Sequence, residues 1–126
     1  QDIGDKVINT IGGGGFMAIM LVYLPPGNYQ IDSIRHVDAL RYMKKQYGRD
    51  FVNLFIDSTE EIRYTRTKER YASFTHFRKI DTANTEKEIE LIRSQSDFTI
   101  MNENSFSDVE MQLEKTVGLF ASQIEY

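Results

Sequence analysis

The 126-residue sequence contains no cysteine, and it has only two prolines and two histidines. Without cysteine there are no disulfides and no thiolate metal ligands, and two isolated histidines leave little from which to build a zinc site. We therefore expect no metal bound by the protein itself. No apolar run approaches the roughly 18 residues that a membrane-spanning helix needs, and the N-terminus lacks the pattern of a signal peptide. These absences favour a cytoplasmic protein that does not enter a membrane.

The composition is that of a globular domain, with 40% hydrophobic and 27% charged residues. A chain of this length fits one small domain with an ordinary core. Its first residues already follow a helical pattern, because Ile3, Val7 and Ile11 recur every four positions. We expect the 126 residues to be part of a longer protein.

The charge is unevenly distributed along the chain. Residues 62–79 carry six cationic side chains and one acidic side chain, a net charge of +5, whereas the whole chain has a net charge of −4. This segment is suited to bind anions. The acidic remainder argues against general nucleic-acid binding, which requires a basic face over much of a domain.

Strand patterns alternate with helix patterns along the chain. Three segments have the length and apolar content of strands, namely residues 28–34, 50–57 and 97–102. Helical patterns cover residues 1–12, 15–24, 36–48, 59–70, 85–95 and the chain from 107 onward. Such alternation predicts an α/β fold with a parallel sheet, because parallel strands need crossover connections.

Local signals predict where helices begin and where loops lie. Three pairs have the spacing of a capping box: Ser58 with Glu61, Thr85 with Glu88, and Ser107 with Glu110. We interpret residues 71–84, which are polar, aromatic and aperiodic, as a mobile loop. The four glycines at 12–15 lack the lysine and hydroxyl residue of a phosphate-binding loop, so we interpret them as a loop too.

Polar side chains follow each predicted strand. They are Asp32, Ser33 and Arg35 after the first strand, Asp57 and Ser58 after the second, and Asn102 after the third. In a parallel sheet the carboxyl ends of the strands share one edge, where ligands bind, so we expect these residues to face one crevice. Each also has an ordinary structural explanation as a helix cap, a turn former or a surface ion pair.

The order of these motifs resembles a known family. From Tyr29 onward, "YQIDSIRHVDALRYMKKQYGRDFVNLFIDSTEEIRYTRTKER", and later "SDFTIMNENS" with a closing helix, are similar to the C-terminal part of P-loop nucleotide kinases. The similarity is to kinases of the deoxynucleoside monophosphate and dephospho-coenzyme A type. It implies ATP-dependent phosphoryl transfer to a nucleotide, with ATP and Mg²⁺ as cofactors.

The resemblance also implies roles for particular residues. It gives Asp32 and Arg35 catalytic positions toward the acceptor and the phosphates. It places Arg66 and Arg70 on the ATP side, Arg78 in a lid at about residues 66–84, and Asn102 beside the adenine. Arginine suits this task because its planar guanidinium binds phosphate through two hydrogen bonds. A solvated, charged helix face is the ordinary alternative for this segment.

The resemblance implies an incomplete fold. Residues 1–126 correspond to the C-terminal part of a single nucleotide-kinase-like domain, a three-layer α/β fold whose parallel sheet lacks the central P-loop strand. We therefore expect three parallel strands with no hydrogen-bonded ladder between residues 28–34 and 50–57. A missing N-terminal segment or another chain would complete the sheet, which leaves room for a homodimer. The alternative is a catalytically inactive, kinase-like module that binds nucleotides or regulates.

Overall fold

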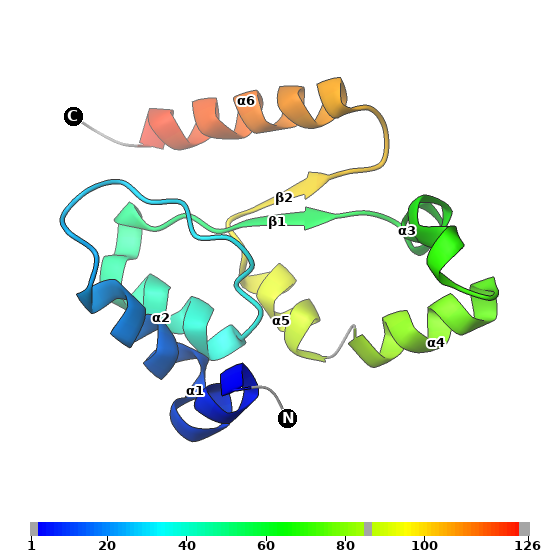
Figure 1. Cartoon of the computed structure of the whole chain (residues 1–126). Coiled ribbons are helices and arrows are strands. Elements are labelled where there is room, and N and C mark those ends of the chain that lie inside the picture. Colours follow the sequence, from blue (N-terminus) through cyan, green and yellow to red (C-terminus); the bar gives the residue numbers. More distant parts are fainter. Residues whose placement is uncertain (1–2, 85–86, 124–126) are drawn as a thin grey trace. The chain divides into compact units, whose positions relative to one another are not determined.

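The computed structural model describes residues 3–84 and 87–123. Over these residues it contains six α-helices, two short 3-10 helices and two strands (Figure 1). In chain order they are α1 (Ile3–Val22), α2 (Val37–Tyr47), η1 (Gly48–Asp50), β1 (Leu54–Asp57), α3 (Glu60–Thr67), η2 (Lys68–Arg70), α4 (Phe74–Asn84), α5 (Lys87–Gln95), β2 (Phe98–Met101) and α6 (Phe106–Gln123). None of these helices is both long enough and apolar enough to cross a membrane.

The chain forms two compact units, each built from two separate stretches of sequence. The first unit comprises Gln1–Asn53 and Lys87–Gln95, and the second comprises Leu54–Glu86 and Ser96–Tyr126. The first unit therefore contains α1, α2, η1 and α5. The second contains both strands, α3, η2, α4 and α6.

The sheet of the second unit confirms the mixed α/β class and two of the predicted strands. Strands β1 and β2 pair in parallel, with Leu54 opposite Phe98 and Asp57 opposite Met101. The predicted third strand, residues 28–34, does not form. Its residue Ser33 has a backbone φ of 63°, a left-handed conformation that an extended strand cannot contain. The sheet of the described residues thus has two strands instead of the predicted three.

One side chain of helix α6 forms hydrogen bonds with the backbone of β2. The backbone N–H of Met101 donates to Oε1 of Gln112 at 2.9 Å, and Nε2 of Gln112 donates to the Met101 carbonyl at 2.8 Å. The amide of Gln112 therefore satisfies both backbone groups of a residue in β2, as a neighbouring strand would. This pairing attaches α6 to β2.

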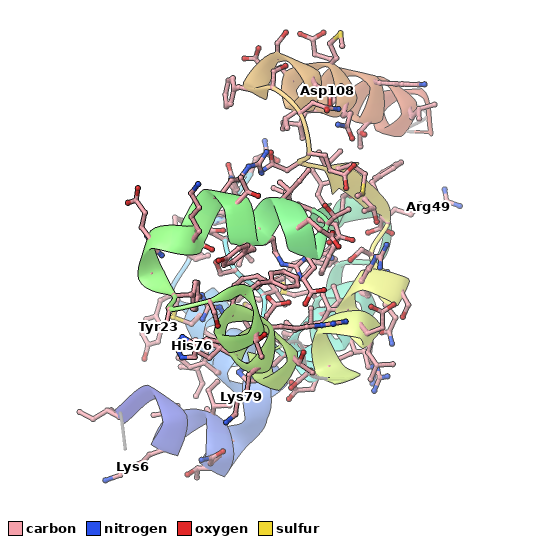
Figure 2. All side chains as sticks on the ribbon, turned by 90° about the vertical axis from the view of Figure 1, so that its right-hand side faces the viewer. Lys6, Tyr23, Arg49, His76, Lys79 and Asp108 are labelled. Carbon is pink, nitrogen blue, oxygen red and sulfur yellow. The ribbon has the colours of Figure 1, made fainter. Side chains whose placement is uncertain are left out.

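Residues 71–84 are mostly helical, so the prediction of a mobile loop was wrong. His76 makes two hydrogen bonds at the start of α4, where Figure 2 labels it. Its N–H donates to Oγ of Ser73 at 3.1 Å, and its Nδ1 accepts the Ala72 N–H at 3.3 Å. Phe77 is only 4% exposed, and its ring lies 5.4 Å from the ring of Tyr64 on α3. Aromatic packing thus stabilises this helix.

The glycines at 12–15 lie where two helical segments of α1 meet, and only Gly12 departs from helical geometry, so the predicted loop is confined to that residue. Gly12 has φ 73° and ψ 170°, which kinks the helix, and α1 continues beyond the kink. A Cβ atom on Gly13 would lie 2.6 Å from both the Cβ of His36 and Oδ1 of Asp38. Glycine is needed because the start of α2 approaches the backbone of α1 this closely.

Two of the three predicted capping boxes differ from the structure. The residue preceding α3 is Thr59, and no side chain caps that helix. Helix α6 begins before Ser107, with Oγ of Ser105 accepting the Asp108 N–H at 3.2 Å. The pair of Thr85 with Glu88 lies partly outside the described residues.

The close approach at Gly13 yields a stability prediction. Gly13→Ala should lower the free energy of unfolding by at least about 1 kcal/mol, because the added methyl group must displace well-packed neighbours. Gly118→Ala, in α6, is the matched control: a Cβ there meets nothing within 4 Å. That control should raise stability by up to about 1 kcal/mol through its better helix propensity. Urea denaturation of both variants measures the difference, and equal effects would contradict the packing described for α1.

Candidate functional site

The carboxyl ends of β1 and β2 form the first candidate site, which lies within the second unit. Asp57 ends β1, and the backbone N–H of Asn102, just beyond β2, donates to the Asp57 carbonyl at 2.7 Å. Ser58 follows, and its N–H donates to Oδ1 of Asp57 at 2.8 Å. The sequence-based expectation that these three residues share one edge of the sheet is confirmed. We call this group, together with Arg66, the strand-end site.

Arg66 joins this site from the last turn of α3. Its Nη1 donates to the carbonyl of Asn102 at 2.7 Å, although the two residues are 36 positions apart in sequence. Two residues assigned to nucleotide binding from the sequence are thus in contact. A guanidinium has five N–H donors, so this bond engages only one of them. The Arg66 side chain is exposed.

Arg70 does not share a helix face with Arg66. Helix α3 ends at Thr67, and Arg70 lies in the tighter turn η2. Thr67 has φ −125° and ψ 6°, which interrupts the helical backbone between the two arginines. The spacing of four residues therefore does not align them as it would in a continuous α-helix. Arg70 is exposed in the same unit.

Acidic residues outside the basic segment neutralise part of its charge. Nε of Arg78 lies 3.2 Å from Oε1 of Glu60, and Nη2 of Arg63 lies 2.6 Å from Oδ2 of Asp81. Arg63 also donates to the carbonyl of Ser58. The predicted ligand residue Arg78 is thus part of an ion pair between α3 and α4. The acids were visible in the sequence, but their pairing depends on α4 being a helix.

Asp32 and Arg35 lie in the first unit, on an irregular segment instead of at the end of a strand. Together with Ser33 and His36 they form the polar side of a hollow of about 300 Å³. The rest of this hollow is lined mainly by apolar side chains of α1, among them Phe16, Met17, Met20 and Leu21. Oγ of Ser33 donates to Oδ1 of Asp32 at 3.2 Å. The predicted catalytic pair thus borders an apolar hollow in its own unit.

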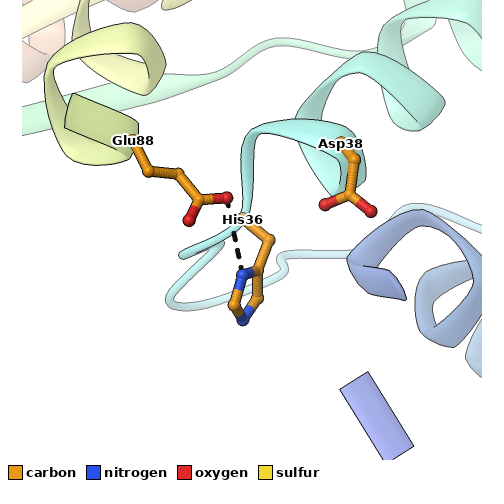
Figure 3. Close-up of side chains that lie close together, drawn as sticks. All are labelled: His36, Asp38 and Glu88. Carbon is orange, nitrogen blue, oxygen red and sulfur yellow. Dashed lines mark ion pairs between the residues drawn. The ribbon is translucent and has the colours of Figure 1, made fainter. Parts of the chain in front are cut away.

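A second cluster in the first unit joins His36, Asp38 and Glu88, each of which offers one donor atom within 4.8 Å of the other two (Figure 3). Nδ1 of His36 lies 3.5 Å from Oε1 of Glu88. Sequence reasoning missed this cluster because Glu88 is about 50 residues from the other two. The packing of α5 against α2 brings it there.

The carboxylate of Asp38 accepts a backbone hydrogen bond at the N-terminus of the helical segment of α1 that follows Gly12. The backbone N–H of Gly14 donates to its Oδ2 at 3.0 Å, which is the main reason why the pKa of this carboxyl lies below its usual 3.8. The N–H groups of Ala39 and Gly13 and the nearby His36 lower the pKa further, whereas partial burial raises it. Asp38 is therefore ionised at neutral pH.

Comparison of the chain with protein-family models, with curated proteins and with solved structures finds no match. The relationship to P-loop nucleotide kinases therefore stays a prediction from the sequence.

The lowered pKa of Asp38 predicts a dependence of stability on pH. At about pH 7, Asp38→Asn should lower the free energy of unfolding by about 0.3 to 1 kcal/mol, because the amide oxygen can still accept the backbone N–H groups but the negative charge near the helix N-terminus is lost. The folded-state pKa is below the unfolded-state value, so this contribution is complete above the unfolded-state pKa and is lost as the pH falls through the folded-state pKa. Urea titrations at several pH values should show the difference shrinking below about pH 4. Asp50→Asn, at an exposed position in η1, is the control. A loss for Asp38→Asn that is equally large at about pH 3 would contradict the charge-based explanation.

Proposed function

We propose that the strand-end site binds the phosphate groups of a nucleotide, with ATP as the reference ligand, as part of an ATP-dependent nucleotide kinase. The observation that carries the proposal is the contact between Arg66 and Asn102 beside the carboxyl ends of two parallel strands. Ligands of open parallel sheets bind at this edge. The kinase would act on a deoxynucleoside monophosphate or a similar acceptor, in the cytoplasm.

Electrostatics support phosphate as the ligand of the strand-end site. Arg66 is held by one hydrogen bond to a backbone carbonyl, which orients the guanidinium without neutralising its charge. Exposed Arg70 follows in η2, so two cations are available in this unit for the charge that spreads over a transferred phosphoryl group. Arg78 is the weaker candidate, because a phosphate would have to compete with Glu60 for it. Mg²⁺ would arrive with the ATP, held largely by phosphate oxygens and water.

The acceptor side of the proposal rests on Asp32 and Arg35. Arg35 would bind the phosphate of the acceptor nucleotide, and Asp32 would orient its acceptor group. The hollow that both residues border offers apolar surface for a base and a sugar. A further segment of the protein or another chain would supply the strand and the phosphate-binding loop that complete a kinase.

A second candidate is a nucleotide-binding or regulatory module without phosphoryl transfer. The glycine run favours this second candidate, because it does not form a phosphate-binding loop. Gly13 and Gly14 pack against the start of α2, and the N–H of Gly14 already donates to Asp38. These glycines are thus not free to wrap phosphates. Incubation of the chain together with the segment or chain that supplies the phosphate-binding loop, with ATP and a deoxynucleoside monophosphate, followed by ³¹P NMR, separates the candidates. Appearance of a deoxynucleoside diphosphate beside ADP supports the kinase, whereas binding without turnover supports the module.

The nucleotide proposal predicts the effect of removing Arg66. Arg66→Ala should weaken ATP binding about tenfold or more, because a charge-assisted hydrogen bond contributes roughly 1.5 to 3 kcal/mol. Arg49→Ala removes an exposed arginine of η1 in the first unit and should leave the dissociation constant unchanged (Figure 2). NMR-monitored titration of the full chain with Mg²⁺–ATP measures both constants. Equal effects of the two variants would leave the basic segment as a solvated surface and end the proposal.

The acceptor proposal has its own test. Arg35→Lys keeps the charge but loses the planar two-donor geometry, so the affinity for a deoxynucleoside monophosphate should fall about fivefold, the value of roughly one hydrogen bond. Asp32→Asn should leave that affinity nearly unchanged. Titrations are run beside thermal melts of both variants. A lower melting temperature with unchanged affinity in Arg35→Lys would identify Arg35 as a structural residue only.

A further inference from the structure

Three metal-ligating side chains form a cluster that includes none of the residues assigned to nucleotide binding, although one of them, His36, also lines the hollow that Asp32 and Arg35 border. His36 immediately precedes α2, Asp38 lies in its first turn, and Glu88 lies in the first turn of α5, all within the first unit. The side chains of His36 and Glu88 are 40% and 32% exposed, so an ion from solvent can reach them. One imidazole and two carboxylates thus meet at the junction of two helices.

The spacing of the donor atoms suits a single metal ion. All three lie within 4.8 Å of one another, and the pair His36 Nδ1 and Glu88 Oε1 is already at 3.5 Å. Metal–ligand bonds of about 2.0 to 2.2 Å place two ligands of one ion roughly 3 to 4.4 Å apart. Small side-chain rotations would therefore bring the third ligand atom, a carboxylate oxygen of Asp38, within this distance of the other two.

Both carboxylates are held in place by backbone N–H groups. Oε1 of Glu88 accepts the Val37 N–H at 2.9 Å, and Oδ1 of Asp38 accepts the Ala39 N–H at 3.0 Å. Oδ2 of Asp38 accepts the Gly14 N–H. A carboxylate oxygen has two lone-pair directions, so one such bond leaves it able to bind a metal as well. Bonds of this kind orient ligands in metal sites and contribute to metal affinity.

We propose that His36, Asp38 and Glu88 bind a divalent first-row transition-metal ion, with Zn²⁺ as the reference ion. The imidazole nitrogen favours Zn²⁺ and its neighbours in the series over Mg²⁺ and Ca²⁺, which prefer sites made of oxygen ligands only. Three protein ligands leave at least one coordination position for water, as in zinc sites that take part in chemistry. The site needs no cysteine, which the chain lacks.

The chain offers a matched control, because its only other histidine is His76. His76 lies in the second unit, where its ring nitrogen accepts the Ala72 N–H. The experiment is a calorimetric titration of the full chain with ZnCl₂, accompanied by NMR of the imidazole nitrogens. Wild-type protein and His76→Gln should bind one Zn²⁺ with the same affinity. Zn²⁺ should shift the ring signals of His36 and leave those of His76 in place.

Substitutions of the metal-ligating residues test the proposal. His36→Gln and Glu88→Gln should each weaken Zn²⁺ binding at least about tenfold. In Glu88→Gln the side-chain oxygen can still accept the Val37 N–H, so a loss of binding there does not arise from a lost cap. Circular dichroism confirms that each variant is folded. Absence of one-site binding at about 1 mM Zn²⁺, or affinity that survives both substitutions, would overturn the proposal. Loss of binding in His76→Gln alone would overturn it as well.

Discussion

Both units depend on side chains that satisfy the backbone groups of distant segments. Among the described residues only six hydrophobic side chains are buried, so apolar burial by itself links few elements. The carboxylate of Asp38 instead binds the backbone of Gly14, 24 residues earlier in the chain. The amide of Gln112 satisfies both backbone groups of Met101. At half-buried Met101 an unpaired polar backbone group would be costly, and this makes the contact with Gln112 specific.

The same kind of contact gives both candidate sites their geometry. Arg66 is oriented by a backbone carbonyl, and its net charge remains available to an anion. Asp38 and Glu88 are oriented by backbone N–H groups. One unit therefore presents a positioned cation and the other presents positioned anions. At each site the backbone contacts leave the charge of the side chains available to a ligand. The sign of that charge decides whether we propose an anion or a metal cation as the ligand.

The charge of a segment is a poor guide to the charge of a surface. The six cations of residues 62–79 suggest one continuous anion-binding face. In the folded chain, however, Glu60 and Asp81 from outside the segment pair with two of them, Arg78 and Arg63. What remains for a ligand is the part of the segment around Arg66. Folding thus reduces the part of the chain that can bind an anion from the whole of residues 62–79 to the region around Arg66.

The sequence by itself determined the elements whose signals are local. Apolar runs predicted β1 and β2, and the alternation of strand and helix patterns predicted that the strands run parallel. Helical patterns and capping signals predicted α2, α3, α5 and α6. The convergence of Asp57 and Asn102 followed from the pairing, since parallel strands end at one edge of a sheet.

Only the tertiary structure decided the elements whose conformation depends on a distant partner. Gly13 and Gly14 allow the start of α2 to pack against α1, and residues 74–84 form a helix whose aromatic side chains meet Tyr64 on α3. Residues 28–34 look like a strand, but they form no ladder and instead contribute to the wall of an apolar hollow against α1. The cluster at His36 also needs a residue from about 50 positions away. Sequence patterns report the preferences of neighbouring residues, whereas these features depend on contacts between residues far apart in the chain.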